Sequence, residues 1–318
     1  MSGASEIFRS LADPTRLRIM NLLRAMELSV GELAQVLGQS QPRVSRHVKI
    51  LIEAGLAERR KEGSWVFLSL GAGERVDPFF NLLDRWSQVD GEDPWTAADA
   101  ARLNAVRADR AAAAERYFAL HANHWDQLRS LHIAETEVEA AIARALGDRA
   151  AGRLVDVGTG TGRMLELFGG GADSAVGIDR SPEMLRLARV KLAEAGLSSA
   201  ELRQADMYSL PLAAGSADTV IIHQVLHYAQ QPAAAVAEAA RLLSSGGRLL
   251  IVDFAPHERE ELRDRDAHAR LGFADEAVIG WMAAAGLEAR VLEHLEGGEL
   301  TVTLWEGERP EARLKVVA

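Results

Sequence analysis

Beyond residue 150 the sequence alternates short apolar runs with stretches of helical periodicity, and this alternation restricts the fold more than any other feature. Such a pattern predicts parallel strands in one sheet, with helices covering both faces. The predicted strands are Leu154 to Val157, Ala175 to Asp179, a weaker one at Glu201 to Gln204, Ala217 to His223 and Arg248 to Phe254. The predicted helices are Pro182 to Glu194, Ala233 to Leu243 and Asp275 to Ala285. A closing antiparallel hairpin is predicted from the strands Glu288 to Leu295 and Leu300 to Trp305.

The first strand leads into a glycine-rich turn, VDVGTGTG, in which Asp156 is followed by Gly158, Gly160 and Gly162. A tight turn from strand to helix favours glycine whatever its ligand, so the glycines alone are weak evidence. The spacing differs from the G-x-G-x-x-G of a dinucleotide site, and the turn lacks the Lys-Ser/Thr ending of a P-loop. The turn therefore has to be interpreted together with the blocks that follow it.

Five blocks in order resemble the class I S-adenosylmethionine-dependent methyltransferases: LVDVGTGTGRML, VGIDRSPEML, QADMYSLPL, ADTVIIHQVLHY and LLSSGGRLLIVDF, over roughly residues 115 to 306. The resemblance implies that S-adenosylmethionine or S-adenosylhomocysteine binds at the carboxyl ends of the strands. Asp156 would organise the loop or reach the amino group, Asp179 would accept both ribose hydroxyls, and Asp206 with the backbone of Met207 would hold adenine. The expected cofactor-binding residues are Asp156, Gly158, Thr159, Gly160, Gly162, Asp179, Arg180, Asp206, Met207 and His223. Each acid has the alternative role of a helix cap or turn residue.

Catalytic residues are not assigned by the sequence. His223, His227 and Tyr228 are weak candidates after the fourth strand, near Gln224, while Asp253, His257 and His268 follow the fifth. Methyl transfer needs alignment and at most one base, and these side chains equally suit structural roles, which we favour. Without cysteine, arsenite methylation is not expected. The mixed-charge run HEREELRDRD from His257 is expected to be helical, as a solvated lid or dimer face.

The first 70 residues predict two helices joined by a tight turn and followed by a basic hairpin, which describes a winged helix-turn-helix. Two helical patterns between Glu6 and Leu23 are broken at Asp13-Pro14. The remaining elements are a helix at Glu27 to Leu37, a turn at Gly38 to Ser40, a helix at Gln41 to Ala54 capped by Ser40 and ended by Gly55, and strands at Leu56 to Arg60 and Ser64 to Leu70 around Lys61 to Gly63.

The stretches LADPTRLRIMNLL, ELSVGEL and SQPRVSRHVKILIEAGLAERRKEGSWVFLSL resemble the ArsR type of bacterial winged-helix repressor, over roughly residues 5 to 70. The metalloid sensors of this type carry two paired cysteines, and the corresponding residues here are Ser29 and Gly31. A hydroxyl group and a glycine cannot replace thiolates as ligands of a soft metalloid. Val44, Val48, Leu51 and Ile52 are expected to be core, while His47 suits either packing or DNA contact. The expected DNA-binding residues are Ser40, Gln41, Arg43, Ser45, Arg46, Lys49, Arg59, Arg60 and Lys61.

The connector carries apolar residues at helical spacing, so one of its faces is expected to be buried, most economically in a homodimer on a palindromic operator. These residues are Val76, Phe79, Phe80, Leu83, Trp86 and Val89. A long helix from Thr96 towards His121 and another from Glu135 to Leu146 would form a strut, a dimer helix or both. The predicted domains are residues 1–90 for DNA binding and dimerisation, 91–150 for the helical connector, and 151–318 for the methyltransferase-like α/β domain.

Charge is distributed unevenly along the chain. Residues 1 to 70 hold ten Lys and Arg against seven Asp and Glu, a balance of +3, whereas the remainder has 26 against 39, a balance of −13. An acidic protein with one basic end fits local contact with DNA. Cysteine is absent, which excludes disulfides and thiolate metal sites, and we expect no metal. No run of eighteen apolar residues and no leader are found, so we expect a cytoplasmic protein without a membrane partner.

Together these features predict a transcriptional regulator, acting as a repressor, whose methyltransferase-like domain binds S-adenosylmethionine or S-adenosylhomocysteine as effector. The resemblance to SahR-like regulators implies control of methionine and S-adenosylmethionine-cycle genes. The alternative is an active methyltransferase of a small molecule with an autoregulatory DNA-binding module. A third interpretation, an interaction protein that has lost its ligands, conflicts with the intact glycines and acids.

Overall fold

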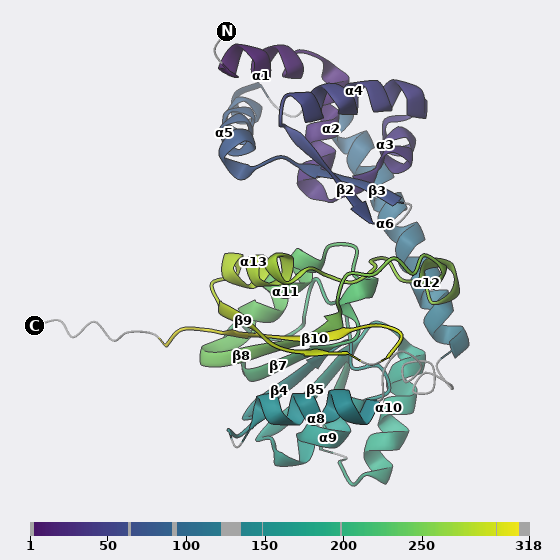
Figure 1. The fold of residues 1–318 in the computed structure, drawn as a ribbon, viewed down its shortest axis with the longest axis vertical. Helices are drawn as coiled ribbons and strands as arrows, with labels where there is room; N and C mark the ends of the chain where they lie inside the picture. Colours follow the sequence, from purple (N-terminus) through teal and green to yellow (C-terminus); the bar gives the residue numbers. More distant parts are fainter. Residues whose placement is uncertain are drawn as a thin grey trace, which may run out of the picture. The chain divides into compact units, whose positions relative to one another are not determined.

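The computed structural model describes residues 3–62, 65–90, 94–121, 135–147, 149–197, 199–296 and 298–311 (Figure 1). It divides into two compact units, Met1–Ala113 and Ala114–Ala318, each with its own hydrophobic core. The finer predicted division at residues 90 and 150 remains a prediction. Among the described residues, no helix combines the length and the apolar character needed to cross a lipid bilayer.

The first unit is a winged helix-turn-helix, as the sequence predicts. Its elements are α1 (Gly3–Leu11), α2 (Pro14–Ala25), β1 (Leu28–Ser29), α3 (Val30–Leu37), α4 (Gln41–Glu53), β2 (Ala57–Glu62), β3 (Trp65–Leu70), α5 (Gly73–Asp90) and α6 (Pro94–His121). The strands form a small sheet in the order β1-β3-β2. Asp13 caps α2 by accepting from the backbone N–H groups of Thr15 and Arg16, and Gly55, with φ of +67°, turns the chain after α4.

Three predictions for this unit are wrong in detail, and a fourth is not decided by a single chain. The segment 27–29 is not helical, because Leu28 and Ser29 pair with β3 and the helix begins at Val30. Strand β2 continues through Glu62, which pairs with Trp65, so Lys61 and Glu62 are not in the hairpin turn. Within the single chain, the apolar face of α5 is buried at Val76 and Phe80 and exposed at Trp86 and Val89, so its burial in a homodimer remains a prediction. The long helix begins at Pro94, two residues before Thr96.

The second unit is a seven-stranded mixed sheet between helices. Its elements are α8 (Glu135–Leu146), β4 (Arg153–Val157), α9 (Arg163–Phe168), η2 (Gly169–Gly171), β5 (Ser174–Asp179), α10 (Pro182–Glu194), β6 (Glu201–Gln204), β7 (Ala217–His223), η3 (Leu226–Tyr228), α11 (Pro232–Arg241), β8 (Leu243–Phe254), α12 (Glu261–Arg265), α13 (Asp275–Ala284), β9 (Glu288–Leu295) and β10 (Val302–Glu308). The strand order is β6-β5-β4-β7-β8-β10-β9. Strand β10 runs antiparallel to β8 and β9 on either side of it, and all other neighbouring strands are parallel.

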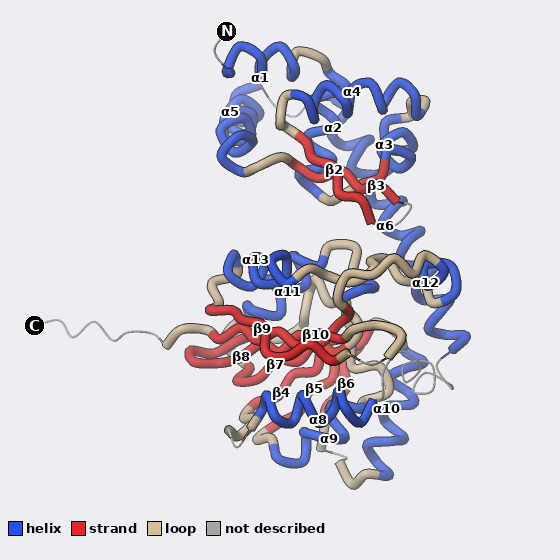
Figure 2. Tube along the Cα trace, viewed as in Figure 1, coloured by secondary structure: helices blue, strands red, loops and turns tan. Residues whose placement is uncertain are grey.

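Figure 2 shows this sheet in red, with α8, α9 and α10 on one side and α11 and α13 on the other. Two cores correspond to the two faces: one joins β7 and β8 to α11 and α13, and the other joins the sheet to α8 and α9. The α/β fold with a closing antiparallel hairpin is therefore confirmed. The expected helix over HEREELRDRD is wrong in extent, because α12 covers only Glu261–Arg265.

The order of the strands reverses next to β4. Strands β5 and β6 lie on one side of β4, and β7 and β8 lie on the other. In open α/β sheets such a reversal of strand order opens a crevice at the carboxyl ends of the strands. The ends of β4 and β7, at Val157 and His223, flank this point.

Candidate functional site

The glycine-rich turn is held in a shape that needs glycine. Gly158, Gly160 and Gly162 have φ values of +73°, +53° and +86°, a region that other residues rarely adopt. The backbone N–H groups of Gly158 and Thr159 both donate to the carbonyl of Ile178, at 2.7 and 3.0 Å. A Cβ on Gly158 would lie 2.6 Å from Val225, so the turn packs directly against the loop that follows β7.

Two of the predicted acids lie at the base of this turn. Asp156 is buried in β4 and accepts a 2.6 Å hydrogen bond from the Thr159 hydroxyl. Asp179, at the end of β5, accepts from the N–H groups of Gly160 and Ser181 at 2.8 Å each. Burial raises the pKa of Asp179, while these backbone N–H groups oppose the shift. Each oxygen of Asp179 keeps acceptor capacity for a further donor, as a ribose diol requires.

Of the alternative roles for Asp179, the structure does not show the helix cap but does show the turn residue, because its Oδ1 accepts from the N–H of Ser181 two residues further on. Ser181 is the N-cap of α10 and accepts from the N–H of Met184, while Asp179 lies before the helix and also binds the glycine turn. One acid therefore links the turn after β4 to the turn after β5.

The third predicted acid lies after β6. Asp206 is half-buried, accepts from the N–H of Tyr208 at 3.1 Å, and lies 3.8 Å from the exposed Arg180. Met207 is half-buried beside it. Tyr208, which the sequence reasoning missed, accepts from the N–H groups of Gln230 and Gln231, and burial raises its pKa. Tyr208 thus ties the adenine-side loop to the segment after η3.

The donor set fits the nucleoside implied by the fold. Asp179 offers a carboxylate for a diol, Asp206 offers one for an amino group, and the glycine turn offers a close backbone approach. Asp156 and His223 point to the same face of the sheet, because Asp156 pairs with Ile221 and His223 lies two residues further along β7. Binding S-adenosylmethionine there would supply an electrophilic methyl group, and S-adenosylhomocysteine is the same ligand without it.

The candidates after β7 are mostly buried. His223 and His227 are 6% and 2% exposed, and Tyr228 packs its ring 4.1 Å from that of His227. Gln224 has φ of +49°, a strained conformation for a residue other than glycine, and such strain is concentrated at functional sites. Sequence patterns carry no signal for this strain. His227 also contacts Asp253, a pairing that the sequence reasoning did not make.

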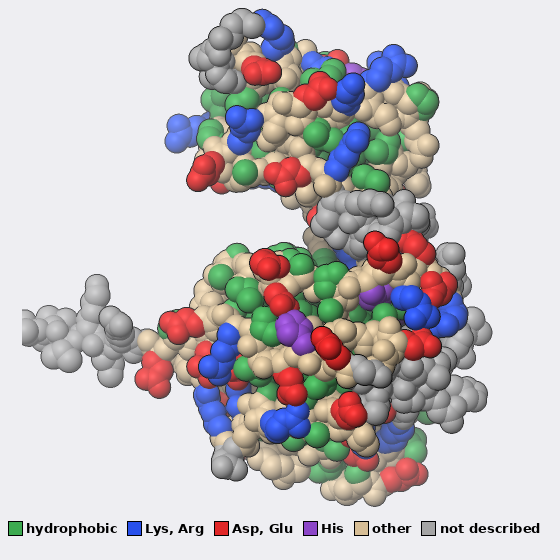
Figure 3. All heavy atoms as spheres, in the orientation of Figure 1, with side chains coloured by type: hydrophobic (Ala, Val, Ile, Leu, Met, Phe, Trp, Pro, Cys, Tyr) green, Lys and Arg blue, Asp and Glu red, His purple; other side chains and the backbone are tan. Residues whose placement is uncertain are grey.

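The predicted DNA-binding side chains of α4 share one face. Gln41, Arg43, Arg46 and Lys49 are exposed and Ser45 is half-buried, whereas Val44, Val48 and Leu51 are fully buried. Ser40 is at the N-cap position but makes no capping hydrogen bond, and Arg59 is exposed on β2. The side chains of Arg60 and Lys61 lie outside the described residues. Figure 3 shows Lys and Arg side chains in blue over α4.

His47 belongs to the packing side of α4 rather than to this exposed face. It is half-buried, and its Nδ1 lies 3.7 Å from Asp13 at the start of α2. Burial lowers the pKa of His47, although Asp13 opposes the shift.

The positions that replace the sensor cysteines have structural roles. Ser29 forms a capping box with Glu32: its hydroxyl accepts from the Glu32 N–H, and its own N–H donates to that carboxylate at 2.8 Å. A Cβ on Gly31 would lie 2.9 Å from Nε2 of Gln41. Gly31 therefore leaves room for a side chain of the recognition helix.

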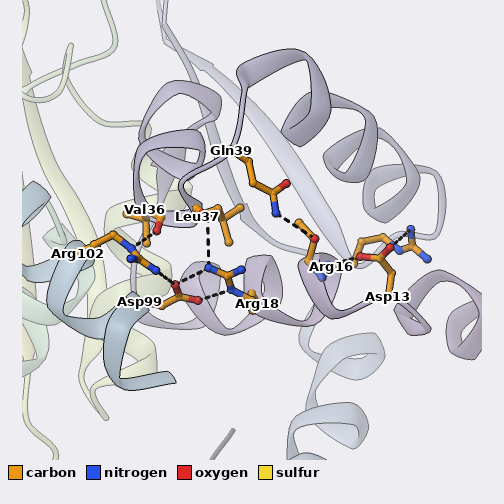
Figure 4. Close-up of polar contacts among 9 residues, drawn as sticks. Asp13, Arg16, Arg18, Val36, Leu37, Gln39, Asp99 and Arg102 are labelled. Atoms are coloured by element: carbon orange, nitrogen blue, oxygen red, sulfur yellow. Dashed lines mark hydrogen bonds and ion pairs between the residues drawn. The ribbon is translucent and has the colours of Figure 1, made fainter. Parts of the chain in front are cut away.

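A network of ion pairs, buried at Arg18 and Asp99, attaches α6 to the helix-turn-helix (Figure 4). Arg18 binds both oxygens of Asp99, at 2.6 and 2.7 Å, and also donates to the carbonyl of Leu37. Arg102 donates to the carbonyl of Val36 and binds Asp99 at 3.0 Å. These carbonyls end α3, directly before the turn into α4. The first part of α6 is thereby fixed to the turn that positions the recognition helix.

Comparisons with known proteins match the two units of the chain to two different families. Residues 13–59 match the family model described as bacterial regulatory protein, arsR family, and residues 155–251 match the model of a methyltransferase domain. Over 100 residues, 30% of this chain and 74% of the other, the chain is 39% identical to an arsenic resistance transcriptional regulator of Pseudomonas putida. This chain belongs to the arsR family. Its ArsR domain is fused to a class I methyltransferase domain.

The methyltransferase domain is similar to enzymes with various substrates. A phosphatidylethanolamine N-methyltransferase of Cereibacter sphaeroides is 34% identical over 139 residues, 43% of this chain and 66% of that enzyme. The structure of an S-adenosylmethionine-dependent methyltransferase of Thermotoga maritima aligns with a TM-score of 0.50 at 21% identity, over 61% of this chain and 99% of that one. The chain spans less than two thirds of that curated methyltransferase, so the matches establish the domain and its fold.

Proposed function

We propose that this ArsR-family protein is a transcriptional repressor whose methyltransferase domain binds S-adenosylhomocysteine or S-adenosylmethionine as its effector. The observation that carries the proposal is α6. It runs as one helix from Pro94 to His121, and Leu103 and Val106 belong to the core of the first unit. The same helix continues past residue 113, where the chain passes from the first unit to the second.

The loss of the thiol sensor supports the same proposal. Ser29 is used as a helix cap and Gly31 leaves room for Gln41, so neither position offers a ligand for a soft metal. The acids of the second unit offer a nucleoside site instead. Contact between α6 and the last turn of α3 gives that site a route to the recognition helix. Allosteric coupling requires only that the ligand bind one arrangement of these elements better than another.

DNA binding is proposed for the exposed face of α4, which enters the major groove, with the β2-β3 wing following the phosphates. Two copies would read a palindrome, and the end of α5 supplies an apolar surface for pairing: the side chains of Trp86 and Val89 are 56% and 80% exposed. Sedimentation at micromolar concentration tests this part. A dimer that Val89→Glu converts to monomer is expected, and a monomeric wild-type chain would contradict it.

The regulated genes are proposed from the ligand. A repressor that senses S-adenosylhomocysteine or S-adenosylmethionine suits genes that make, use or remove these compounds, namely those of the methionine and S-adenosylmethionine cycle. The geometry of Asp179 supports the ligand on which this part of the proposal depends.

Calorimetric titration of the full chain with each nucleoside tests the effector site. The wild type is expected to bind both compounds, and Asp179→Ala to bind them at least about tenfold more weakly, because a hydrogen bond to a charged acceptor is worth roughly 1.5–3 kcal/mol. Asp173→Asn, an exposed acid before the other end of β5, is the matched control and should bind normally. Heat absent from the wild-type titrations would contradict the proposed effector.

A further inference from the structure

Five rings are packed together where η3 and the end of β8 meet the segment 255–274. Ring centroids of His227 and His268 lie 4.3 Å apart, and His268 stacks on Phe254 at 5.7 Å with only 15° between the planes. Tyr228 lies 4.1 Å from His227, and His257 lies 6.4 Å from His268. No group of metal-ligating side chains converges to hold an ion within the described residues.

His227 is held by one carboxylate at two points. Its Nδ1 lies 2.7 Å from Oδ1 of Asp253, and its backbone N–H donates to Oδ2 of the same residue at 3.1 Å. Asp253 is fully buried and also accepts from the N–H of Phe254 at 2.8 Å. A carboxylate beside Nδ1 keeps the imidazole proton on that nitrogen, so Nε2 carries the lone pair. This is how an oriented base is built.

The pair lies next to the proposed nucleoside site. Helix η3 begins one residue after Val225, whose side chain packs against Gly158 of the glycine turn. Both chain segments that reach the pair contain a strained residue, Gln224 with φ of +49° and Ala267 with φ of +56°. Arg270 fixes the second segment to the first, because its backbone N–H donates to the carbonyl of His227 at 2.9 Å.

We propose that His227 is a catalytic base, positioned by Asp253, and that the methyltransferase domain methylates a phenolic hydroxyl. This activity goes beyond effector binding and rests only on the nucleoside half of the proposed function. The His227 side chain is 3% exposed, and the ring of His268 lies 4.3 Å from it, so the proposal requires the His268 ring to move before an acceptor reaches His227. The segment that carries His268 thereby becomes the wall of the acceptor site.

The reaction balances with S-adenosylmethionine as the methyl donor. The phenolic oxygen attacks the methyl carbon, forming a C–O bond as the S–CH₃ bond breaks, and the bonding pair stays on sulfur to give S-adenosylhomocysteine. The phenolic proton passes to Nε2 of His227. The resulting imidazolium is stabilised by the Asp253 carboxylate and later loses its proton to water.

The surroundings favour a phenol over an amine. Tyr228 and Phe254 have planar rings beside His227, and such rings suit stacking on a planar aromatic acceptor. Arg270 is 3% exposed and donates to the carbonyl of Gln230 at 2.7 Å. A fixed cation therefore lies in the segment 255–274, which also carries His268. A buried cation favours an oxygen that becomes negative in the transition state and disfavours an ammonium group.

Two probes distinguish a base from a structural residue. Catechol must lose its proton during transfer, whereas 4-nitrophenol is already ionised at mildly alkaline pH and needs no base. The full-length wild type is expected to methylate both from radiolabelled S-adenosylmethionine. His227→Gln and Asp253→Asn should slow catechol methylation at least about 100-fold and change 4-nitrophenol methylation only a few-fold. The matched control is His294→Gln. His294 lies on β9 and also pairs with an aspartate, because its Nε2 is 3.2 Å from the carboxylate of Asp275 in α13.

Equal losses with both phenols would overturn the proposal, and so would a wild type that methylates neither. A second readout does not depend on turnover. In ¹⁵N-histidine spectra, one imidazole should be protonated at Nδ1, and Asp253→Asn should abolish that signal. Its absence from the wild type would also count against the proposal. Calorimetry with S-adenosylmethionine on the same variants separates the two hypotheses: normal binding without base-dependent transfer removes the catalytic role and leaves the effector site intact.

Discussion

Replacing Asp99 should loosen α6 from the DNA-reading domain. Asp99 and Arg18 form a bidentate pair whose side chains are 8% and 13% exposed, and Asp99 also binds Arg102. Asp99→Ala leaves the Arg18 guanidinium buried without its carboxylate. Removing one partner of a buried pair costs about 3–5 kcal/mol. Because each 1.4 kcal/mol is a factor of ten, local opening of α6 should increase at least about 100-fold.

Hydrogen exchange of the full-length protein measures this opening directly. Amides between Pro94 and Val106 should exchange at least about 100-fold faster in Asp99→Ala, while the second unit is unaffected. The matched control is Asp84→Ala, because Asp84 also binds an arginine of α2, Arg24, at 2.7 and 2.9 Å. That pair is about half exposed, so its loss should leave exchange almost unchanged. Similar behaviour of the two variants would refute the claim that burial makes the Arg18–Asp99 pair an anchor.

The remaining predictions concern DNA, ligand and acid stability. Arg43→Ala and Arg46→Ala should each weaken operator binding by roughly 1–3 kcal/mol without unfolding the protein, measured by fluorescence anisotropy. Because burial raises the pKa of Asp179 and the diol binds its ionised form, nucleoside affinity should fall on acidification at a higher pH than for an ordinary aspartate; calorimetry across pH should show no such dependence in Asp179→Asn. Hydrogen bonding from Arg153 lowers the pKa of Asp218 in the folded protein. The pair therefore stabilises the fold at pH values above the aspartate pKa of the unfolded chain, and this stabilisation is lost as the pH falls through the lower pKa of the folded state. Asp218→Asn should lower the melting temperature at neutral pH and make the melting temperature fall less steeply in acid.

The α/β domain could be predicted because its information is local. Each parallel strand is a continuous apolar run, and the acids at Asp156 and Asp179 end or interrupt such runs, so the carboxyl edge of the sheet is visible in the sequence. The recognition helix α4 could be predicted in the same way, since the buried Val44, Val48 and Leu51 recur at helical spacing among polar residues. Strand and helix ends differ by a few residues, as at Leu243, where β8 begins five residues before the predicted start.

Features that depend on distant partners could not be predicted. Leu28 is a strand residue only because it pairs with Leu68, and the local sequence there is compatible with a helix. His227 lies in η3 and Asp253 near the end of β8, so their pairing follows from topology rather than from spacing. The strain at Gln224 is likewise imposed by the surrounding fold, since its N–H is fixed to the carbonyl of Val252 at 2.7 Å.

Operator titration with and without nucleoside tests the central claim most directly. The full-length protein is titrated at fixed salt against a duplex that it has itself selected from random-sequence DNA, because salt alone shifts such affinities strongly. Saturating S-adenosylhomocysteine should change operator affinity 5- to 150-fold, as expected for a coupling of roughly 1–3 kcal/mol, and more than S-adenosylmethionine does. Asp179→Ala should bind the operator normally and show no response to the same nucleoside concentration. Identical curves for the wild type in all three conditions would contradict the account.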